Sequence, residues 1–444
     1  MKIQNRLRDR HGKPGRLLPA ETRRKRHPQF QPFCFARVLP VFILFTFKLC
    51  VFPLFVFTLC VFPGHASQAG TQAPSRAEKP SASVVEIVEF EREGKSGVLA
   101  GRVLVEAQDG GILLEGEDGQ LWPLLSEQVI SRRKGERPFR RLGSEELARK
   151  LQEELPPGFA VKKTAHYLIV YQTNEAYASW CGWLFERLYT AFINFWKRRG
   201  LPVQAPEYPL VAIVFANRSN FQVFAREEAG QAAATIIGYY HLEKNRMVLY
   251  DITETATWAR PSTGSKRTLS EINRIFLHPE AHRTVATIIH EATHQLCFNC
   301  GLLRRFSDCP LWLSEGIAIY FETPDLQSTS GWRGVGELNS VRLADFRQYL
   351  ATRPEESLKS LIATEDRFRD PRQAQAAYAE AWALTYFLIR RYPERFNEYL
   401  RLIGQKPLMI WDDESTRIKD FQEAFGPDLD RLDEEFLRYM ERLK

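Results

Sequence analysis

The chain lacks a basic excess outside its first 66 residues. Residues 1–66 hold 12 Lys and Arg against 2 acidic residues, a net charge of +10, whereas the other 49 basic and 52 acidic residues give −3. A domain that binds nucleic acid needs a basic surface that neutralises phosphates. The overall net charge of +7 therefore gives no support to nucleic-acid binding, and we expect no nucleic-acid partner.

Cysteine is scarce, and its spacing argues against one kind of metal site. Outside residues 1–66 there are four cysteines: Cys181, Cys297, Cys300 and Cys309. A four-thiolate site needs two C-x-x-C pairs, and Cys297 with Cys300 forms the single pair of that spacing. The four cysteines could form two disulfides, with three possible pairings, or remain buried thiols. We favour either of these over a metal-binding role.

Charge is absent from residues 49–62, directly after a long basic stretch that ends at Lys48. Small residues then stand three and one before a possible cut after Ala66. Basic, apolar and small-residue parts in this order are typical of a secretory signal. Residues 38–62, interrupted only by Lys48, are also long enough for an uncleaved membrane anchor. We therefore interpret residues 1–66 as a signal peptide or signal anchor and expect export to the periplasm or cell envelope.

Glycine and proline are absent from residues 287–296, and this absence favours a helix. The run contains H-E-A-T-H, in which His290 and His294 are four residues apart and so lie on one helix face. Imidazole is a preferred zinc ligand, and Glu291 is placed to act as a base on zinc-bound water. The chain has only 9 His. Chance would produce such a motif in roughly one such chain in a hundred.

A catalytic zinc ion needs a third protein ligand and one open position for water. Glu315 stands in an apolar segment that predicts a second helix, and a carboxylate in such surroundings needs a partner. Twenty residues separate it from His294, enough for a turn and a returning helix. We therefore interpret His290, His294 and Glu315 as the ligands of one Zn²⁺ ion. The alternative is a surface glutamate that caps a helix N-terminus.

These motifs carry a resemblance. H-E-A-T-H at residues 290–294 and W-L-S-E-G-I-A at residues 312–318 resemble the gluzincin branch of the zincin metallopeptidases, which includes thermolysin and aminopeptidase N. Residues 290–322 resemble still more closely a family of exported bacterial proteins with a gluzincin-like domain of unknown function, and the similarity covers about residues 160–405. The resemblance implies a zincin fold, zinc and peptide-bond hydrolysis.

Two further residue roles follow from the resemblance. Tyr378 begins an apolar helix and is similar in placement to the transition-state tyrosine of the aminopeptidase N family. It is our candidate donor for the oxyanion, with simple packing as the alternative. Met247 to Tyr250 is our candidate for the edge strand that binds extended substrate, with an interior strand as the alternative.

Two elements of these families are missing. The chain has no Gly-x-Met-Glu-Asn sequence, with which the aminopeptidases hold a free N-terminus, so exopeptidase activity is not supported. In thermolysin-like enzymes an aspartate four residues after the ligand glutamate orients a zinc histidine. Ile319 stands at that position here, so the orienting group must come from elsewhere.

Composition and turn signals divide the remaining chain into three parts. Residues 67–81, rich in Ser, Ala, Gln and Pro, indicate a linker. Residues 82–142 combine short apolar runs with Asp-Gly turns and predict a small β-rich domain. Its basic stretch, residues 132–141, is interpreted as a solvated interdomain surface, with binding of an anionic envelope polymer as the less favoured alternative. We expect residues 143–444 to form the metallopeptidase domain that the resemblance implies.

Hydrophobic periodicity predicts the elements of that domain. Helices are expected at residues 144–155, 175–199, 343–352, 373–391, 393–403, 416–425 and 429–443, strands at 167–171 and 210–215, and a hairpin at 238–251. The aromatic face of the helix at 175–199 is interpreted as core. The predicted fold is therefore α+β, a zincin-like domain with a mixed sheet, an active-site helix and a helical C-terminal part.

The expected function is a zinc-dependent peptide-bond hydrolase, an endopeptidase that acts on a peptide or protein substrate outside the cytoplasm. Glu291 would assist the attack of zinc-bound water on the scissile carbonyl. The alternative is a catalytically silent envelope-binding module in which zinc serves stability. The presence of Glu291 argues against that alternative, because a purely structural zinc site has no need of a base.

Overall fold

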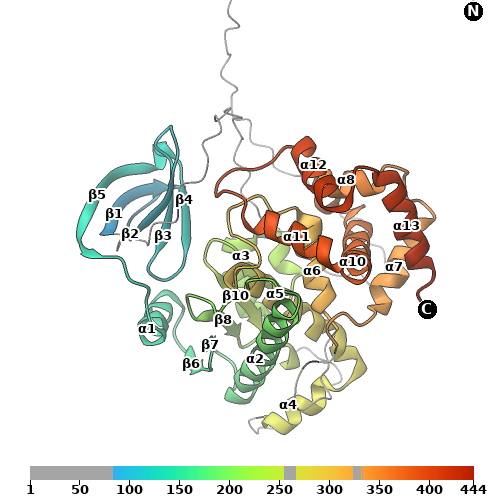
Figure 1. Ribbon diagram of the computed structural model, residues 1–444. Helices are drawn as coiled ribbons and strands as arrows, with labels where there is room; N and C mark the ends of the chain where they lie inside the picture. Colours follow the sequence, from blue (N-terminus) through green and yellow to red (C-terminus); the bar gives the residue numbers. More distant parts are fainter. Residues whose placement is uncertain (1–83, 255–266, 324–331, 333) are drawn as a thin grey trace, which may run out of the picture. The chain divides into compact units, whose positions relative to one another are not determined.

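The computed structural model describes residues 84–254, 267–323, 332 and 334–444 (Figure 1). These residues belong to one compact unit, residues 52–444. The predicted signal or anchor and the predicted linker lie outside the described residues. None of the helices in the described part combines the length and the apolar character that a membrane crossing requires. The architecture is α+β, as the sequence predicted, with a β-rich N-terminal region and a helical C-terminal region.

The N-terminal region is a five-stranded antiparallel sheet in the order β4-β3-β2-β1-β5. Its strands are β1 (Val84–Arg92), β2 (Lys95–Glu106), β3 (Ile112–Gly116), β4 (Leu121–Leu124) and β5 (Val129–Pro138). Gly110 and Gly119 have positive φ angles of 91° and 82°, which explains the two Asp-Gly turns. A small apolar core holds the sheet together and includes Val88, Phe90 and Leu114.

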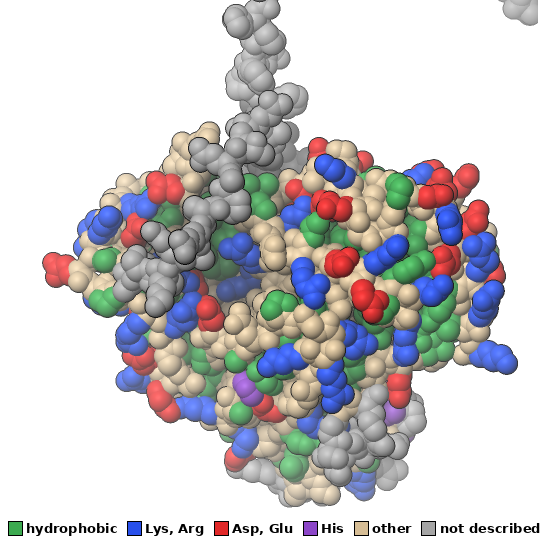
Figure 2. Space-filling view, in the orientation of Figure 1, with side chains coloured by type: hydrophobic (Ala, Val, Ile, Leu, Met, Phe, Trp, Pro, Cys, Tyr) green, Lys and Arg blue, Asp and Glu red, His purple; other side chains and the backbone are tan. Residues whose placement is uncertain are grey.

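Four arginines of the basic stretch, residues 132–141, form ion pairs with acidic side chains. Its ion pairs are Arg132 with Glu86 and Glu106, Arg137 with Glu117, Arg140 with Glu146, and Arg141 with Glu207. Figure 2 shows basic and acidic side chains interspersed over the face in view. These ion pairs agree with a solvated surface, and binding of an anionic envelope polymer stays the less favoured alternative.

The second sheet is mixed and has the order β6-β7-β8-β10-β9. Its strands are β6 (Ala160–Lys163), β7 (Tyr167–Tyr171), β8 (Leu210–Phe215), β9 (Gly238–His241) and β10 (Arg246–Tyr250). The three central strands are parallel, and β6 and β9 pair with them in antiparallel orientation. The expectation that Met247 to Tyr250 form the edge is therefore wrong. β10 is buried along its whole length between β8 and β9, and β9 is the edge strand.

Helices pack against this second sheet and also form most of the remaining described residues. They are α1 (Ser144–Glu154), α2 (Glu175–Lys197), α3 (Arg218–Ala229), α4 (Leu269–Phe276), α5 (Pro279–Asn299), α6 (Leu311–Phe321), α7 (Ser340–Leu350), α8 (Ser357–Ala363), α9 (Asp366–Arg369), α10 (Ala374–Arg391), α11 (Pro393–Gly404), α12 (Glu414–Phe425) and α13 (Leu429–Glu441), with 3₁₀ turns at Ser126–Gln128, Gly230–Ala234 and Ile252–Glu254. Helices α1, α2, α3 and α5 are those that pack against the sheet. The helices expected from periodicity are present, whereas α3, α4, α8 and α9 were not predicted.

Helix α2 buries most of its aromatic face, as expected. Trp180, Phe185 and Phe192 are fully buried in the core, which makes this helix the apolar support of strand β7 and of helix α5. Trp183 is the exception, because it is 36% exposed and stacks on the guanidinium of Arg187 at 4.4 Å. The core assignment was therefore right for the face as a whole and wrong for Trp183.

Helix α10 is the centre of the C-terminal part, where α6, α7, α9, α11 and α13 contact it. Helix α10 packs tightly against α6 at Gly316. A Cβ atom at Gly316 would lie 2.6 Å from the carbonyl oxygen of Ala381, a distance that real Cβ contacts do not reach. The absence of a side chain at Gly316 therefore lets the two helices approach, and this approach places its neighbour Glu315.

None of the four described cysteines forms a disulfide. Cys181, Cys297 and Cys300 are buried and Cys309 is half-buried, so of the two expectations the buried thiol holds and the disulfide does not. Burial disfavours the thiolate and raises the pKa of Cys300 to about 12. The thiols therefore contribute to the apolar core as small side chains.

Candidate metal centre

Helix α5 carries the first two candidate ligands. Its 21 residues run beside β9 and β10, and the Gln295 amide fixes it to the sheet by donating a hydrogen bond of 2.9 Å to the Val211 carbonyl on β8. His290 and His294 are one turn apart and almost completely buried, 1% and 0% exposed. Their Nε2 atoms are 3.0 Å apart. The helix thus points both imidazoles at the same small volume.

Helix α6 brings Glu315 to the same place. One carboxylate oxygen lies 3.0 Å from Nε2 of His290 and the other 3.5 Å from Nε2 of His294. The three ligand atoms lie within 4.8 Å of one another, a group that could hold one metal ion. Glu315 is 0% exposed, so the alternative of a surface cap is wrong. Cys297 is not part of this group, although it lies on the same helix.

The donor set fits a cation on physical grounds. Apart from the two imidazoles, no described residue donates a hydrogen bond to the buried carboxylate of Glu315. Burial opposes charge on Glu315, but the charges of His294 and His290 outweigh it and lower the pKa of this carboxyl to about 2. Burial also opposes charge on His290, yet Glu315 and Glu322 raise its pKa. The centre therefore favours positive charge where the three side chains meet.

Glu291 faces the edge strand. Its Oε2 accepts a hydrogen bond of 2.8 Å from the backbone N–H of Tyr240 on β9. The side chain is 4% exposed, and this burial raises the pKa of its carboxyl although the neighbouring histidines act in the opposite direction. A buried carboxylate beside the ligands, and outside the ligand group, is suited to accept a proton.

Glu322 is a functional candidate that the sequence analysis missed. It stands at the C-terminal end of α6, and its Oε1 lies 2.7 Å from Nδ1 of His290. Arg342 on α7 lies 3.6 Å from the same oxygen, and the Asn339 amide lies 3.5 Å from the other. Glu322 is thus positioned to orient the His290 ring, which Ile319 cannot do because it has no polar side chain. The spacing in the sequence could have indicated it, because Glu322 follows Glu315 by seven residues, which is two helical turns and places both on the same helix face.

Tyr378 lies on α10 close to the centre. Its ring is buried and packs edge-on against Phe368, with ring centroids 5.2 Å apart. Burial raises the pKa of its hydroxyl well above the ordinary value, and the charges of Glu315 and Glu291 raise it further. The structure therefore brings Tyr378 within electrostatic reach of both carboxylates.

The comparisons with known proteins locate the same region without assigning chemistry to it. A family model described as a protein of unknown function (DUF1570) matches residues 284–409. That span includes the candidate ligands, Glu291, Glu322 and Tyr378. A search of curated proteins finds no match. The chemistry therefore has to be argued from the centre itself.

Proposed function

We propose that the chain is a zinc-dependent peptide-bond hydrolase, an endopeptidase that acts on a peptide or protein substrate. The observation that carries the proposal is the convergence of His290, His294 and Glu315 beside Glu291. The ligand atoms lie within 4.8 Å of one another, and all four side chains are buried. Two imidazoles and one carboxylate are a donor set of catalytic zinc sites.

The arrangement of the elements supports a zincin-like domain. Helix α5 runs beside a mixed sheet, α6 returns with the third ligand, and the edge strand β9 contacts Glu291. Among the described residues, no strand pairs with the outer side of β9. An extended peptide can pair with such an edge by main-chain hydrogen bonds. We therefore transfer the substrate-binding role from Met247–Tyr250 to β9.

Each side chain of the centre has a role in this proposal. His290, His294 and Glu315 would hold zinc, which when bound supplies a Lewis acid for a carbonyl and lowers the pKa of water. Glu291 takes the proton of the attacking water on its carboxylate and gives it to the leaving amine. The Nδ1–H group of His290 would donate a hydrogen bond to the Glu322 carboxylate, so that Nε2 presents its lone pair to the centre.

Tyr378 is the proposed oxyanion donor. Its raised pKa keeps the hydroxyl protonated, which a hydrogen-bond donor requires. The hydroxyl would donate to the oxygen on which negative charge develops as the carbonyl becomes tetrahedral.

The site of action is proposed to lie outside the cytoplasm, in the periplasm or cell envelope. The support comes from residues 1–66, where a basic stretch precedes an apolar run and a small-residue cleavage site. Cleavage near Ala66 would release the chain, and retention of residues 38–62 would anchor it to the membrane.

One observation favours the alternative of a catalytically silent module. The four central side chains are between 0% and 4% exposed, as in a closed structural metal site. In that case zinc would contribute only to folding stability, and the protein would bind an envelope partner. The base Glu291 separates the two functions, because only the hydrolase needs it.

The test compares wild type and Glu291→Gln after zinc reconstitution. We expect about one zinc per chain in both proteins, because Glu291 is not a ligand. In a peptide-library digest followed by mass spectrometry, the variant should lose activity by at least ~10²–10⁴-fold, the contribution of general-base catalysis. His294→Ala is the matched control that loses the metal. Equal cleavage by wild type and Glu291→Gln would refute the mechanism, and a zinc-loaded wild type that cleaves nothing would favour the silent module.

Tyr378→Phe tests the oxyanion donor in the same assay. The change removes one hydroxyl and leaves the packing against Phe368, so zinc content should be unchanged. The expected loss in kcat is roughly 10²–10³-fold, the effect of deleting one oxyanion donor. If this variant kept full activity, the role of Tyr378 would be packing only.

A further inference from the structure

The tip of the β9–β10 hairpin is held by the N-terminal sheet. We call residues 242–245 the hairpin tip. The backbone N–H of Leu121, the first residue of β4, donates a hydrogen bond of 2.8 Å to the carbonyl of Glu243. The guanidinium of Arg92, at the end of β1, donates to both carboxylate oxygens of Glu243 at 3.3 and 3.4 Å. Two strands of the sheet therefore contact one residue of the tip.

Arg305 makes a second connection between the same parts. It follows α5 in the chain, and its guanidinium donates to two backbone carbonyls. One hydrogen bond, of 3.1 Å, goes to Leu242 in the hairpin tip, and the other, of 2.9 Å, goes to Gly119 in the β3–β4 turn. The planar fork of an arginine can make both bonds at once, which a lysine cannot do with the same geometry.

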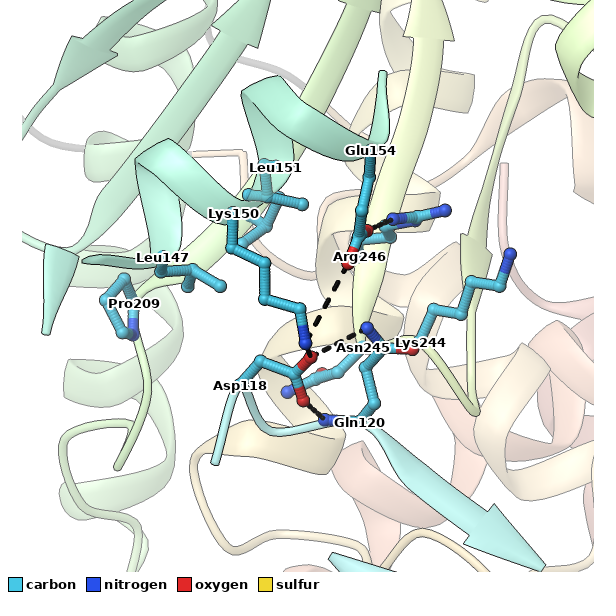
Figure 3. A pocket seen from close by; sticks show the side chains of 11 residues that line it. Asp118, Gln120, Leu147, Lys150, Leu151, Glu154, Pro209, Lys244, Asn245 and Arg246 are labelled. Carbon is cyan, nitrogen blue, oxygen red and sulfur yellow. Dashed lines mark hydrogen bonds and ion pairs between the residues drawn. The ribbon is translucent and has the colours of Figure 1, made fainter. Parts of the chain in front are cut away.

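A chain of charges adds a third connection (Figure 3). Figure 3 shows Lys150 of α1 between Asp118 and Glu154, with Glu154 turned toward Arg246. A carboxylate oxygen of Glu154 lies 3.4 Å from one guanidinium nitrogen of Arg246. A carboxylate oxygen of Glu228, on α3, lies 2.8 Å from another nitrogen of the same guanidinium. Asp118, Lys150, Glu154 and Arg246 line a small cavity between the β3–β4 turn, α1 and the start of β10. The base of the hairpin tip is therefore tied to the N-terminal sheet through α1.

The hairpin is also hydrogen-bonded to helix α5, which carries the candidate ligands. Asn245 in the tip exchanges two amide hydrogen bonds, of 2.8 and 2.7 Å, with Asn299 at the end of α5. The Tyr240 hydroxyl donates to the Asn245 side chain at 2.7 Å, while the Tyr240 backbone N–H donates to Glu291. Tyr240 thus joins the hairpin tip to the candidate base. An edge strand is supported by a neighbour on one side only, so its position depends strongly on such anchors.

We propose that the N-terminal sheet positions the substrate-binding edge of the metal centre through the hairpin tip, with Glu243 and Arg305 as positioning residues. These two side chains touch neither the ligands nor Glu291. They fix the strand whose outer edge would pair with a peptide and whose Tyr240 N–H donates a hydrogen bond to the base. The effect on peptide binding rests on the proposed function, whereas the anchoring of the hairpin by the N-terminal sheet does not.

The first experiment measures the anchoring by hydrogen–deuterium exchange of the full chain. The variant Glu243→Ala/Arg305→Ala removes the ion pair with Arg92 and both Arg305 bridges. We expect exchange in residues 238–250 to rise at least about tenfold, while α2 and β7 keep wild-type rates, because local opening is governed by local contacts. The matched control is Arg304→Ala, an exposed neighbour, which should exchange as wild type does. Unchanged exchange in the hairpin would overturn the proposal.

The second experiment measures the consequence for the zinc-loaded protein with two inhibitors. A peptidyl hydroxamate reaches both the zinc and the strand edge, whereas acetohydroxamate reaches the zinc alone. The double variant should bind the peptidyl compound at least about tenfold more weakly, and it should bind acetohydroxamate and zinc as wild type does. A more mobile edge strand loses more conformational entropy when a peptide pairs with it, which weakens binding. Arg305→Lys should recover part of the loss in the single Arg305→Ala variant.

Two other outcomes are informative. Equal losses for both hydroxamates would mean that the variant disturbs the whole centre, which overturns a positioning role. If zinc-loaded wild type binds neither compound, the proposed function falls. The exchange experiment then still decides whether the N-terminal sheet anchors the hairpin.

Discussion

The two ring nitrogens of His290 face two carboxylates. Nε2 lies 3.0 Å from Glu315, and Nδ1 lies 2.7 Å from Glu322. A histidine that donates its Nδ1 proton to a carboxylate presents Nε2 as a more basic ligand in a fixed orientation. Arg342 approaches the same oxygen of Glu322 and Asn339 approaches the other, so the orientation of His290 depends on helix α7 and its N-cap as well.

Glu322→Gln is the prediction at this scale. The amide keeps the size of the side chain but removes the negative charge that holds the Nδ1 proton. Zinc affinity, measured by competition with a chelating dye, should fall about 10–100-fold, the usual effect of losing such a partner. The exposed Glu355→Gln on the loop before α8 is the control and should bind zinc as wild type does. Wild-type affinity in Glu322→Gln would show that His290 needs no orienting carboxylate.

Two elements decide whether the ligands can meet. Helix α5 supplies His290 and His294 from one face, which needs no tertiary contact. Helix α6 supplies Glu315 only because it packs tightly on α10, and Gly316 makes this possible. A side chain at Gly316 would collide with the backbone of Ala381, which cannot move away as a flexible side chain would.

Gly316→Ala is the prediction at the scale of elements. The added methyl group should separate α6 from α10 and lower the free energy of unfolding by about 1–3 kcal/mol, the typical cost of overpacking. Because Glu315 precedes Gly316, zinc affinity should fall as well. Urea unfolding and zinc titration measure the two effects. Gly143→Ala, at the N-cap of α1 with open space around it, should cost less than about 1 kcal/mol and leave zinc binding intact.

Across the molecule, buried ion pairs connect different helices and strands. Glu228 of α3 is one such junction. Its side chain is 4% exposed and lies 2.8 Å from Arg246 and 2.5 Å from Lys244. Burial would raise the pKa of Glu228, but the charges of Arg246 and Lys244 outweigh it and lower the pKa to about 2.

The acid stability of the protein should depend on Glu228. A carboxyl with a depressed pKa in the folded state stabilises that state above its unfolded pKa, near 4.5. This contribution, of the order of 3 kcal/mol, is lost as the pH falls from about 5 toward 2. Glu228→Gln should therefore be less stable than wild type at pH 7, and the difference should shrink as the pH falls toward 3.

Unfolding midpoints measured in urea across this pH range check the prediction. Glu227→Gln is the control, because Glu227 is the exposed neighbour of Glu228 and should follow the wild-type profile. A constant difference between wild type and Glu228→Gln from pH 7 to pH 3 would contradict the assigned role.

The sequence by itself determined the features that depend on local spacing. The i and i+4 positions of His290 and His294 on a helix follow from helix geometry alone. The burial of Glu315 follows from its apolar neighbours, and the turns of the N-terminal sheet follow from Asp-Gly pairs. These patterns concern residues close in sequence or the simple contrast of apolar and polar positions, so they do not require knowledge of the neighbours in space.

Only the tertiary structure decided which elements are neighbours. β10 and β9 form one hairpin in the sequence, and the parallel pairing of β10 with β8 makes β9 the edge. The pairing of His290 with Glu322 needs the crossing of α5 and α6, and the anchoring of the hairpin tip needs Arg92 and Arg305 from distant segments. Strand order and contacts between elements depend on how the whole chain packs, because hydrogen bonds and ion pairs form between groups that no local periodicity relates.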